Sequence, residues 1–264
     1  MELNLKDKVV ILTGPAKGMG AAITMAFARE GSRLVLVGRD TSAIKPVQSE
    51  AERAGAEAII VPCDVTDSQA CENVAMVALD RFGGRIDVLV NIAGGSGPIG
   101  KTGAQTTQEE FDEIVHLNMC GPFNMIRAVA PAMQKHKYGK IVNIGGTFGM
   151  RGRAGRMAYS SSKWGLRGIT KSFALELGGD NINVNCVAPG MVDGPRFRSK
   201  VVPEMAKRLD ISEDEAAAHH ASDYALKRIS NGDDVAHATL FLASDVSRQI
   251  TGTDIPVDGG WAVL

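Results

Sequence analysis

Seven short runs of mainly apolar, often β-branched residues alternate with longer stretches that have the periodicity of helices. The runs are apolar at consecutive positions, which is typical of strands buried on both faces of a parallel sheet. The stretches between them, such as residues 21–31 and 111–133, are long enough to be helices that connect parallel strands. The pattern predicts a doubly wound α/β sheet of about seven strands with helices on both faces. The expected strands are residues 9–13, 33–37, 58–61, 87–91, 140–144, 182–187 and 254–257.

The 264 residues contain no linker, repeat or low-complexity run, so we expect one domain over residues 1–264. One segment, at about 191–228, breaks the alternation by inserting about one acidic helical pattern. Insertions that follow the carboxyl end of a strand often build substrate lids in such folds. The alternative for this segment is a solvated surface helix.

Composition argues against several classes of protein. The formal net charge of −1 is spread without a long basic block, which argues against nucleic acid as a partner. No apolar stretch approaches the ~20 residues of a membrane span, and the N-terminus lacks a targeting pattern, so a cytoplasmic protein is expected. No metal site is predicted, because the four cysteines lack zinc-like spacing and the adjacent His219 and His220 would diverge on a helix.

A glycine-rich turn follows the first expected strand. Residues 13–20 read TGPAKGMG and lead into a helical stretch. Glycines allow a sharp turn and a close approach to a pyrophosphate, and the following helix end offers free N–H groups to an anion. The turn therefore predicts a dinucleotide site, with a packing role for the glycines as the alternative.

Tyr159 and Lys163 are four residues apart in a helical stretch after the fifth expected strand, so both project from one helix face. A free tyrosine, with a pKa near ~10, is a poor base at neutral pH, and a neighbouring ammonium favours the phenolate. The pair therefore indicates general acid/base chemistry at Tyr159.

The segments TGPAKGMG, CDVTD, VNIAGG, HLNMCG, YSSSK, VAPG and VDGG occur in the order and approximate spacing of one family. Over nearly its whole length the chain resembles the short-chain dehydrogenases/reductases. The resemblance implies a Rossmann-type single-domain fold, a nicotinamide cofactor, and the interconversion of an alcohol and a ketone with a small molecule as substrate. It also implies a homotetramer, with contacts from the helix that begins at Tyr159 and from the C-terminal VDGGWAVL, and with anchors at Trp261 and Leu264. The alternative for each is a place in the core of its own chain.

The resemblance also implies roles for individual residues. Asn118 would hold a water that connects Lys163 to solvent, and Lys163 would hold the nicotinamide ribose. Asp64 would meet the adenine, although a helix cap is the alternative for this residue. The implied cofactor-binding residues are Gly14, Lys17, Gly18, Met19, Gly20, Arg39, Asp64, Val65, Asn91, Ala93, Gly94, Tyr159, Lys163, Pro189, Gly190 and Val192.

The end of the second expected strand favours NADP(H) over NAD(H). An acidic residue there would bind the ribose hydroxyls of NAD and repel a 2′-phosphate. This place is Gly38, and Arg39 follows, while Lys17 adds a second cation. Asp40 is the opposing observation, because it would reach the ribose if the turn were shifted by one residue, and Arg39 would then only stack on the adenine.

The family's catalytic serine, thirteen residues before the tyrosine, is Gly146 in this chain. A side-chain donor to a reacting oxygen is typically worth ~10²- to 10³-fold in kcat. We predict that Thr147 supplies the missing hydroxyl. The alternatives are a polar group of the substrate or a water, or a weakly active protein that senses nucleotides.

Three arginines, Arg151, Arg153 and Arg156, lie between the fifth strand and Tyr159. Guanidinium groups suit a carboxylate, sulfonate or phosphate, so an anionic substrate is predicted, with solvated or paired arginines as the alternative. The leading prediction is an NADP(H)-dependent alcohol/ketone oxidoreductase. An NAD-dependent dehydrogenase of a ring alcohol or diol is the second enzyme hypothesis.

Overall fold

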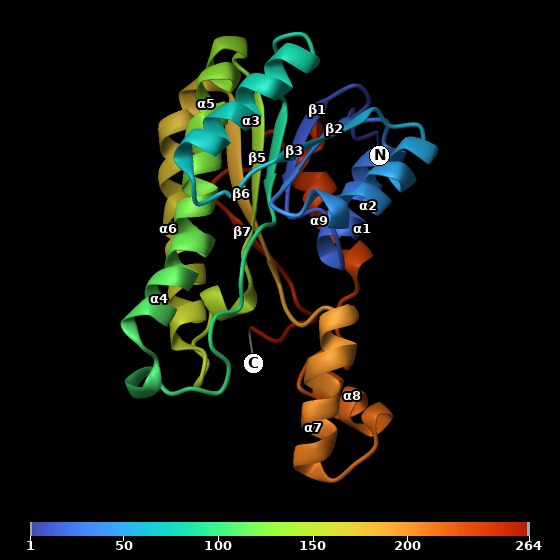
Figure 1. The fold of residues 1–264 in the computed structure, drawn as a ribbon, viewed down its shortest axis with the longest axis vertical. Helices are drawn as coiled ribbons and strands as arrows, with labels where there is room; N and C mark the ends of the chain where they lie inside the picture. Colours follow the sequence, from blue (N-terminus) through green and yellow to red (C-terminus); the bar gives the residue numbers. More distant parts are fainter. Residues whose placement is uncertain (1, 263–264) are drawn as a thin grey trace.

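The computed structural model describes residues 2–262. Within them, seven strands form one sheet in the order β3-β2-β1-β4-β5-β6-β7 (Figure 1). Every neighbouring pair of strands is parallel, which confirms the predicted doubly wound sheet. The strands are β1 (Val9–Thr13), β2 (Arg33–Gly38), β3 (Ala58–Pro62), β4 (Val88–Asn91), β5 (Gly139–Ile144), β6 (Ile182–Pro189) and β7 (Asp254–Val257).

Helices cover both faces of the sheet, because the side chains of each strand alternate between two apolar cores. In β1, Val10 and Leu12 join the core beneath α1, α2 and α9, whereas Val9 and Ile11 join the core beneath α3, α5 and α6 (Figure 1). The helices are α1 (Met19–Arg29), α2 (Thr41–Arg53), α3 (Ser68–Arg81), α4 (Gln108–Val115), α5 (Gly121–His136), α6 (Met157–Leu177), α7 (Val202–Leu209), α8 (Glu213–Ser222) and α9 (Gly232–Ala243).

None of these helices is both long enough and apolar enough to cross a bilayer, a finding that covers residues 2–262.

The helical stretch predicted over residues 111–133 is two helices joined by a π-helical turn. The turn spans His116–Cys120 and separates α4 from α5. A π-helical turn adds a residue to the helical path, and such turns often occur at functional sites. Periodicity alone did not reveal this break.

The insertion after β6 contains two helices, where the sequence suggested about one acidic helical pattern. In Figure 1, α7 and α8 project beyond the end of the sheet. They share a small core of Phe197, Val202, Ala206 and Ala216, separate from the two cores that flank the sheet. Three acidic residues of the predicted segment lie in the first turn of α8, where negative charge favours the helix.

The chain reverses its direction across the sheet between β1 and β4. From β1 the sheet grows to β2 and β3 on one side, and from β4 to β5, β6 and β7 on the other. Loops diverge at such a switch point, and ligands of doubly wound folds bind there, outside the carboxyl ends of the strands.

Candidate active site

The glycine-rich turn after β1 lies against the loop that follows β4. Gly14 has a φ of 68°, and a Cβ on this residue would lie 3.0 Å from the Cα of Ala93. A Cβ on Gly20 would overlap the carbonyl oxygen of Gly14. Gly18 is the N-cap of α1, and no described side chain caps the first N–H groups of that helix, which begins at Met19. Gly14 and Gly20 are therefore required for close packing within the turn, which was the alternative for the glycines, and the uncapped N–H groups of α1 are the feature of the turn that suits a pyrophosphate.

Thr13 fixes the loop after β4 and was missed by the sequence reasoning. Its Oγ1 accepts hydrogen bonds from the backbone N–H groups of Ile92, at 3.0 Å, and Ala93, at 3.1 Å. The two loops at the switch point are therefore joined directly. The available signal was the threonine immediately before the first glycine of the turn.

A buried polar chain joins β4, β5 and α6. The Asn91 amide donates to Oδ1 of Asn143 at 2.9 Å, and the Asn143 amide donates to Oγ1 of Thr170 at 2.9 Å. Thr170 in turn donates to the carbonyl of Leu166. The side chain of Asn91, a predicted cofactor residue, thus tethers the sheet to α6.

Asp64, the predicted adenine residue, lies after β3, and the helix-cap alternative for it is wrong. Asp67 caps α3 instead, accepting from the backbone N–H groups of its first turn. The Asp64 carboxylate accepts from the N–H and hydroxyl of Thr66, at 3.0 and 2.7 Å. These bonds, followed by the charge of Arg39, hold the pKa of Asp64 below its usual value. Arg39 lies 3.5 Å from the carboxylate.

The rest of the predicted adenine-side residues lie at the end of β2 and in the glycine turn. Asp40 is the N-cap of α2, and its Oδ1 accepts from the N–H of Ala43 at 3.1 Å. Gly38 packs tightly, because a Cβ there would lie 3.0 Å from Ile44. Lys17 is exposed. The side chain of Asp40 thus has a structural role that accounts for its position.

Val65, another predicted cofactor residue, is buried, and its side chain packs where α5 begins. A Cβ on Gly121 would lie 2.8 Å from its Cγ2. The Val65 carbonyl accepts from the side chains of Asn124, at 3.0 Å, and Cys71, at 3.4 Å. The segment after β3 is therefore held firmly in place.

Asn118 lies in the π-helical turn, and its buried side chain is fixed on both sides. Its Nδ2 donates to Oγ of Ser162 at 3.0 Å and to the carbonyl of Gly95 at 3.1 Å, while Oδ1 accepts from the N–H of Gly95 at 2.8 Å. The turn therefore links the loop after β4 to α6.

Tyr159 and Lys163 lie on one face of α6, as their spacing predicts. The Lys163 Nζ donates to the carbonyl of Ile144, at the end of β5, with a distance of 2.9 Å. The same nitrogen lies 5.8 Å from the centre of the Tyr159 ring. A Cβ on Gly94 would lie 2.9 Å from Oδ1 of Asn118 and 3.8 Å from Nζ of Lys163. Of the four predicted catalytic side chains, Asn118 and Lys163 thus lie beside Gly94, and Tyr159 lies next to Lys163.

Burial shifts the pKa values of this pair in directions that favour the neutral forms. It lowers the pKa of Lys163 to about 8. It raises the pKa of Tyr159, against the charges of Arg156 and then Arg196, which favour the phenolate. Lys163 is thus partly neutral in mildly alkaline solution, whereas the guanidinium of Arg156 stays charged.

Gly146 is the residue that faces the Tyr159 hydroxyl. A Cβ on Gly146 would lie 3.1 Å from that oxygen and 3.9 Å from the carbonyl oxygen of Pro189. Its φ of 162° is extended backbone that any residue adopts. Thr147 is buried and begins the following 3₁₀ turn, with its carbonyl accepting from the N–H of Met150. No hydrogen bond of the Thr147 hydroxyl lies within the described residues, so its catalytic role stays a prediction.

The segment after β6 is braced by the root of the insertion. The N–H of Met191 donates to the hydroxyl of Tyr224 at 3.0 Å. Gly190 packs so closely that a Cβ there would lie 3.0 Å from Asp258 and 3.2 Å from the Tyr224 ring. Val192 forms a single parallel bridge outside the sheet. The sequence reasoning did not identify Tyr224 or Asp258 as supports for this predicted cofactor segment.

The structure separates the three arginines of the 150–157 loop. The guanidinium carbon of Arg156 lies 4.8 Å from the centre of the Tyr159 ring. Arg151 instead lies over the indole of Trp261, at 4.9 Å, and donates to its carbonyl at 3.2 Å. Arg153 is exposed. Of the three predicted substrate residues, only Arg156 therefore contacts Tyr159.

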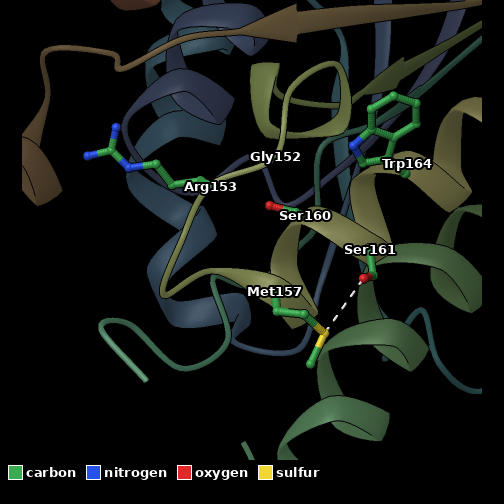
Figure 2. A pocket seen from close by; sticks show the side chains of 6 residues that line it. All are labelled: Gly152, Arg153, Met157, Ser160, Ser161 and Trp164. Atoms are coloured by element: carbon green, nitrogen blue, oxygen red, sulfur yellow. Dashed lines mark hydrogen bonds between the residues drawn. The ribbon is translucent and has the colours of Figure 1, made fainter. Parts of the chain in front are cut away.

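Figure 2 shows a hollow on the outer side of this region, lined by side chains from the 150–157 loop and the first turns of α6. Arg153 points away from the other lining residues. Tyr159 does not line this hollow, so the hollow borders the candidate active site without containing its chemistry. The lining residues are Gly152, Arg153, Met157, Ser160, Ser161 and Trp164.

Comparison with known proteins gives a consistent result. A family model described as "Enoyl-(Acyl carrier protein) reductase" matches residues 14–262. The chain is 34% identical to the 3-oxoacyl-[acyl-carrier-protein] reductase FabG of Thermotoga maritima, over 99% of this chain and 100% of that protein. It is 33% identical to a 2,5-dichloro-2,5-cyclohexadiene-1,4-diol dehydrogenase, LinX, of Sphingobium indicum, over 100% and 99% of the two chains.

A solved structure of an actinorhodin polyketide ketoreductase variant with NADPH superimposes with a TM-score of 0.90, at 30% identity and 98% coverage of both chains. The chain belongs to the short-chain dehydrogenase/reductase family. Members of this family are oxidoreductases that act on alcohol or ketone groups with NAD(P)(H), and this chain is one of these enzymes.

In this short-chain dehydrogenase/reductase the predicted catalytic residues Asn118, Tyr159 and Lys163 lie together, next to Gly146. The two residues predicted as anchors between subunits are Trp261 and Leu264. Trp261, an expected intersubunit anchor, is buried in its own chain, where it packs on Phe148 with ring centres 5.4 Å apart. Leu264 lies outside the described residues.

The two histidines of the insertion also lie in different environments. His219 is exposed. His220 is half-buried, with ring centres 5.5 Å from Phe197 and 5.9 Å from Tyr224, and burial lowers its pKa. The two side chains diverge on α8, as adjacent residues of a helix do.

Proposed function

We propose that this enzyme interconverts a secondary alcohol and a ketone with NADP(H), and that its substrate carries an anionic group. The observation that carries the reaction is that Asn118 and Lys163 lie beside Gly94, in the loop after β4, with Tyr159 next to Lys163 on the same face of α6. A proton donor and a fixed cation adjoin the loop that borders the cofactor site. The relatives' names support the same type of reaction.

The bound nicotinamide supplies or accepts the hydride. Tyr159 gives its hydroxyl proton to the carbonyl oxygen during reduction and takes it back from the alcohol during oxidation. Lys163, held by the Ile144 carbonyl, supplies positive charge near the phenol and holds the nicotinamide ribose. Asn118, fixed by Ser162 and Gly95, holds a water that leads to solvent. Each role follows from the side chain's fixed position and from the family resemblance.

The preference for NADP(H) rests on the residues after β2. Arg39 is exposed, and its surface ion pair with the Asp64 carboxylate, 3.5 Å away, is weak enough for a 2′-phosphate to replace it. Asp40, the residue that opposed this assignment, is engaged as the cap of α2. Lys17 adds charge on the same side. NAD(H) is the alternative, as in the hypothesis of a ring-diol dehydrogenase, and the name of the LinX relative supports that substrate class.

Replacing Arg39 with alanine is expected to lower kcat/KM for NADPH by ~10- to 100-fold, because a charge-assisted hydrogen bond is worth about 1.5–3 kcal/mol. The value for NADH should change little. Steady-state kinetics with both cofactors measure the effect. Asp40→Asn is the control, because asparagine also caps helices and leaves the cation in place. A wild-type enzyme that prefers NADH would contradict the assignment.

Arg153 is the arginine that carries the proposed anionic substrate group most directly. It is exposed, and within residues 2–262 no hydrogen bond or ion pair holds its guanidinium. Burial is the main cause of the lowered pKa of His220, and the charge of Arg153 acts in the same direction, so Arg153 lies near the insertion. Arg156 and Arg151 were predicted for the same role, but each contacts an aromatic ring of the protein.

A carboxylated ketone is expected to have a kcat/KM at least ~10 times that of its neutral methyl ester, and Arg153→Gln should remove most of this difference. The arginine acts on binding, so the change should appear mainly in KM. A panel of matched ketones measures it. Equal values for the charged and neutral substrates in the wild type would rule out the anionic substrate while leaving the redox activity in place.

A homotetramer is part of the proposal. Phe123 on α5, and Trp164 and Leu175 on α6, are large apolar side chains with 41%, 49% and 86% exposure. Apolar surface of this kind favours association.

A protein that senses nucleotides without turnover is the alternative function of another class, suggested by the absence of the serine at Gly146. Cofactor binding without turnover on ketones and alcohols would favour it.

A further inference from the structure

The Tyr159 hydroxyl is surrounded by cations and lacks a hydroxyl partner at Gly146. Two positive groups lie over its ring, Lys163 from the same helix and Arg156 from the loop before it, and the charge of Arg196 in the insertion also acts on the phenol. Arg156 is the nearest to the ring centre, at 4.8 Å against 5.8 Å for Lys163. The Tyr159 ring also packs edge-on against Phe148, with the two ring centres 6.0 Å apart.

Arg156 is held in place without being neutralised. One of its Nη2 hydrogens is donated to the carbonyl of Ser96 at 3.0 Å, and this carbonyl lies in the loop after β4. Its Nε is buried and has no hydrogen-bond partner among the described residues. Within residues 2–262 no carboxylate forms an ion pair with Arg156 or Arg196. A fixed positive charge therefore remains beside the phenol.

Helix stability does not explain this position. Arg156 is the N-cap residue of α6, and its side chain makes no cap bond there. A cation at a helix N-terminus is opposed by the helix dipole, and burial of the guanidinium adds a further cost. Residues that lower stability in a folded protein are often retained for function.

Lys163 supplies less positive charge to the phenol than Arg156 does, because its own pKa is low. Lys163 has a pKa of about 8, and its Nζ donates to Ile144. At mildly alkaline pH part of the Lys163 population is neutral. An arginine stays protonated throughout this range, even when buried. Near the phenol, Arg156 is therefore the permanent charge.

We propose that Arg156 is a positioning residue for the reaction: its guanidinium stabilises the anionic form of Tyr159 in place of the hydroxyl that is absent at Gly146. This inference rests on the proposed oxidoreductase function and assigns part of its chemistry to a residue outside the tyrosine, lysine and asparagine set. It also separates two roles, because Arg153 is then the arginine for the substrate anion and Arg156 serves the phenol.

The first test measures the Tyr159 phenol without any substrate. The chain has three tyrosines, so a carbon-13 label at the tyrosine Cζ gives three resonances, which Tyr138→Phe and Tyr224→Phe assign. In Arg156→Gln the pKa of Tyr159 should rise by at least about one pH unit, because an opposite charge within ~4–6 Å shifts a pKa by about 1–3. Arg156→Lys should restore most of the change.

Arg153→Gln is the matched control for this titration, since it removes the same charge from the same loop without contacting the ring. The Tyr159 pKa should stay in place. Should Arg156→Gln fold poorly, Arg156→Met is the second variant, because it removes the charge and keeps a long, flexible side chain for packing. An unchanged Tyr159 pKa in folded Arg156→Gln overturns the proposal.

The second test is kinetic and is read in the direction of alcohol oxidation, which needs the phenolate. In Arg156→Gln the acid limb of kcat/KM should move to higher pH, with a loss of ~10-fold or more at neutral pH that is recovered on the alkaline plateau. A purely structural defect would lower kcat/KM equally at every pH, and that result would overturn the proposal.

Gly146→Ser links the two sites. Its Cβ would lie 3.1 Å from the Tyr159 oxygen, so a small adjustment places a hydroxyl beside the phenol. The serine should recover at least ~10-fold of the neutral-pH activity in Arg156→Gln and change the wild type less. Equal effects in both backgrounds would show independent sites. A wild type without turnover would refute the proposed function, whereas the tyrosine titration would still decide the role of Arg156.

Discussion

Replacing Tyr159 with phenylalanine is expected to lower kcat by ~10²- to 10⁴-fold in both directions, because the reacting oxygen loses its proton donor and acceptor. The phenol oxygen makes no hydrogen bond within residues 2–262, and phenylalanine keeps the edge-on contact with Phe148. The free energy of unfolding and the Kd for the cofactor should therefore change little. Single-turnover kinetics with the reduced cofactor, together with urea unfolding, separate the chemical effect from any effect on stability.

Thr147→Val is the partner of this experiment. If the Thr147 hydroxyl replaces the absent serine, the variant should lose ~10²-fold in kcat, as for other oxyanion donors. A variant with full kcat, beside an inactive Tyr159→Phe, would show that Thr147 has no such role. A side chain at position 146 would point at the Tyr159 oxygen, so the comparison of Thr147→Val with Tyr159→Phe shows whether the neighbouring hydroxyl takes over that place.

Replacing Lys163 with methionine is expected to lower kcat/KM by ~10²-fold or more and, at pH 7, to stabilise the fold. The pKa of Lys163 falls from 10.5 to about 8 in the folded protein. At ~1.4 kcal/mol per pH unit this difference corresponds to a cost of about 3 kcal/mol for the charged form. The lost hydrogen bond to Ile144 offsets about 1 kcal/mol, so a net gain of about 2 kcal/mol is expected.

The pH dependence of this gain follows from the sign of the shift. Below pH 8 the lysine is charged in both states, and the folded state bears the full cost. Between pH 8 and 10.5 the unfolded state binds more protons than the folded one, so the stability of the wild type rises with pH. The advantage of Lys163→Met should therefore shrink over this range. Urea unfolding of both proteins at pH 7 and pH 10 measures it, and an equal difference at the two values would contradict the assigned pKa.

The sheet could be predicted from the sequence because each strand is apolar at consecutive positions. Runs such as residues 33–37 and 140–144 lie within one residue of β2 and β5. Buried parallel strands leave this signal because both of their faces meet helices. The π-helical turn at Asn118 left none, since one extra residue in a helical path changes the hydrogen bonding and not the apolar pattern.

The candidate site was predicted where chemistry depends on spacing along one element. Tyr159 and Lys163 share a helix face, so their separation of four residues is sufficient to place them together. For Asp64 the local pattern did not show which aspartate caps α3, and Asp67, three residues later, does so. The contact of Arg151 is tertiary, because its guanidinium lies over the indole of Trp261 in the C-terminal segment. Contacts between residues distant in sequence cannot be read from local patterns.

The buried series of hydrogen bonds from Asn91 through Asn143 to Thr170 has a consequence for mutational scans. These hydrogen bonds fix the axial position of α6 against the centre of the sheet, and α6 carries Tyr159 and Lys163. An apolar substitution at any of these three residues would leave a buried hydrogen-bonding group unsatisfied and let α6 shift by fractions of an ångström. Substitutions of residues far from any substrate would then lower activity as strongly as substitutions of residues that touch it. A map of the positions that are sensitive to mutation would include the residues that hold α6 in place as well as those that line the pocket.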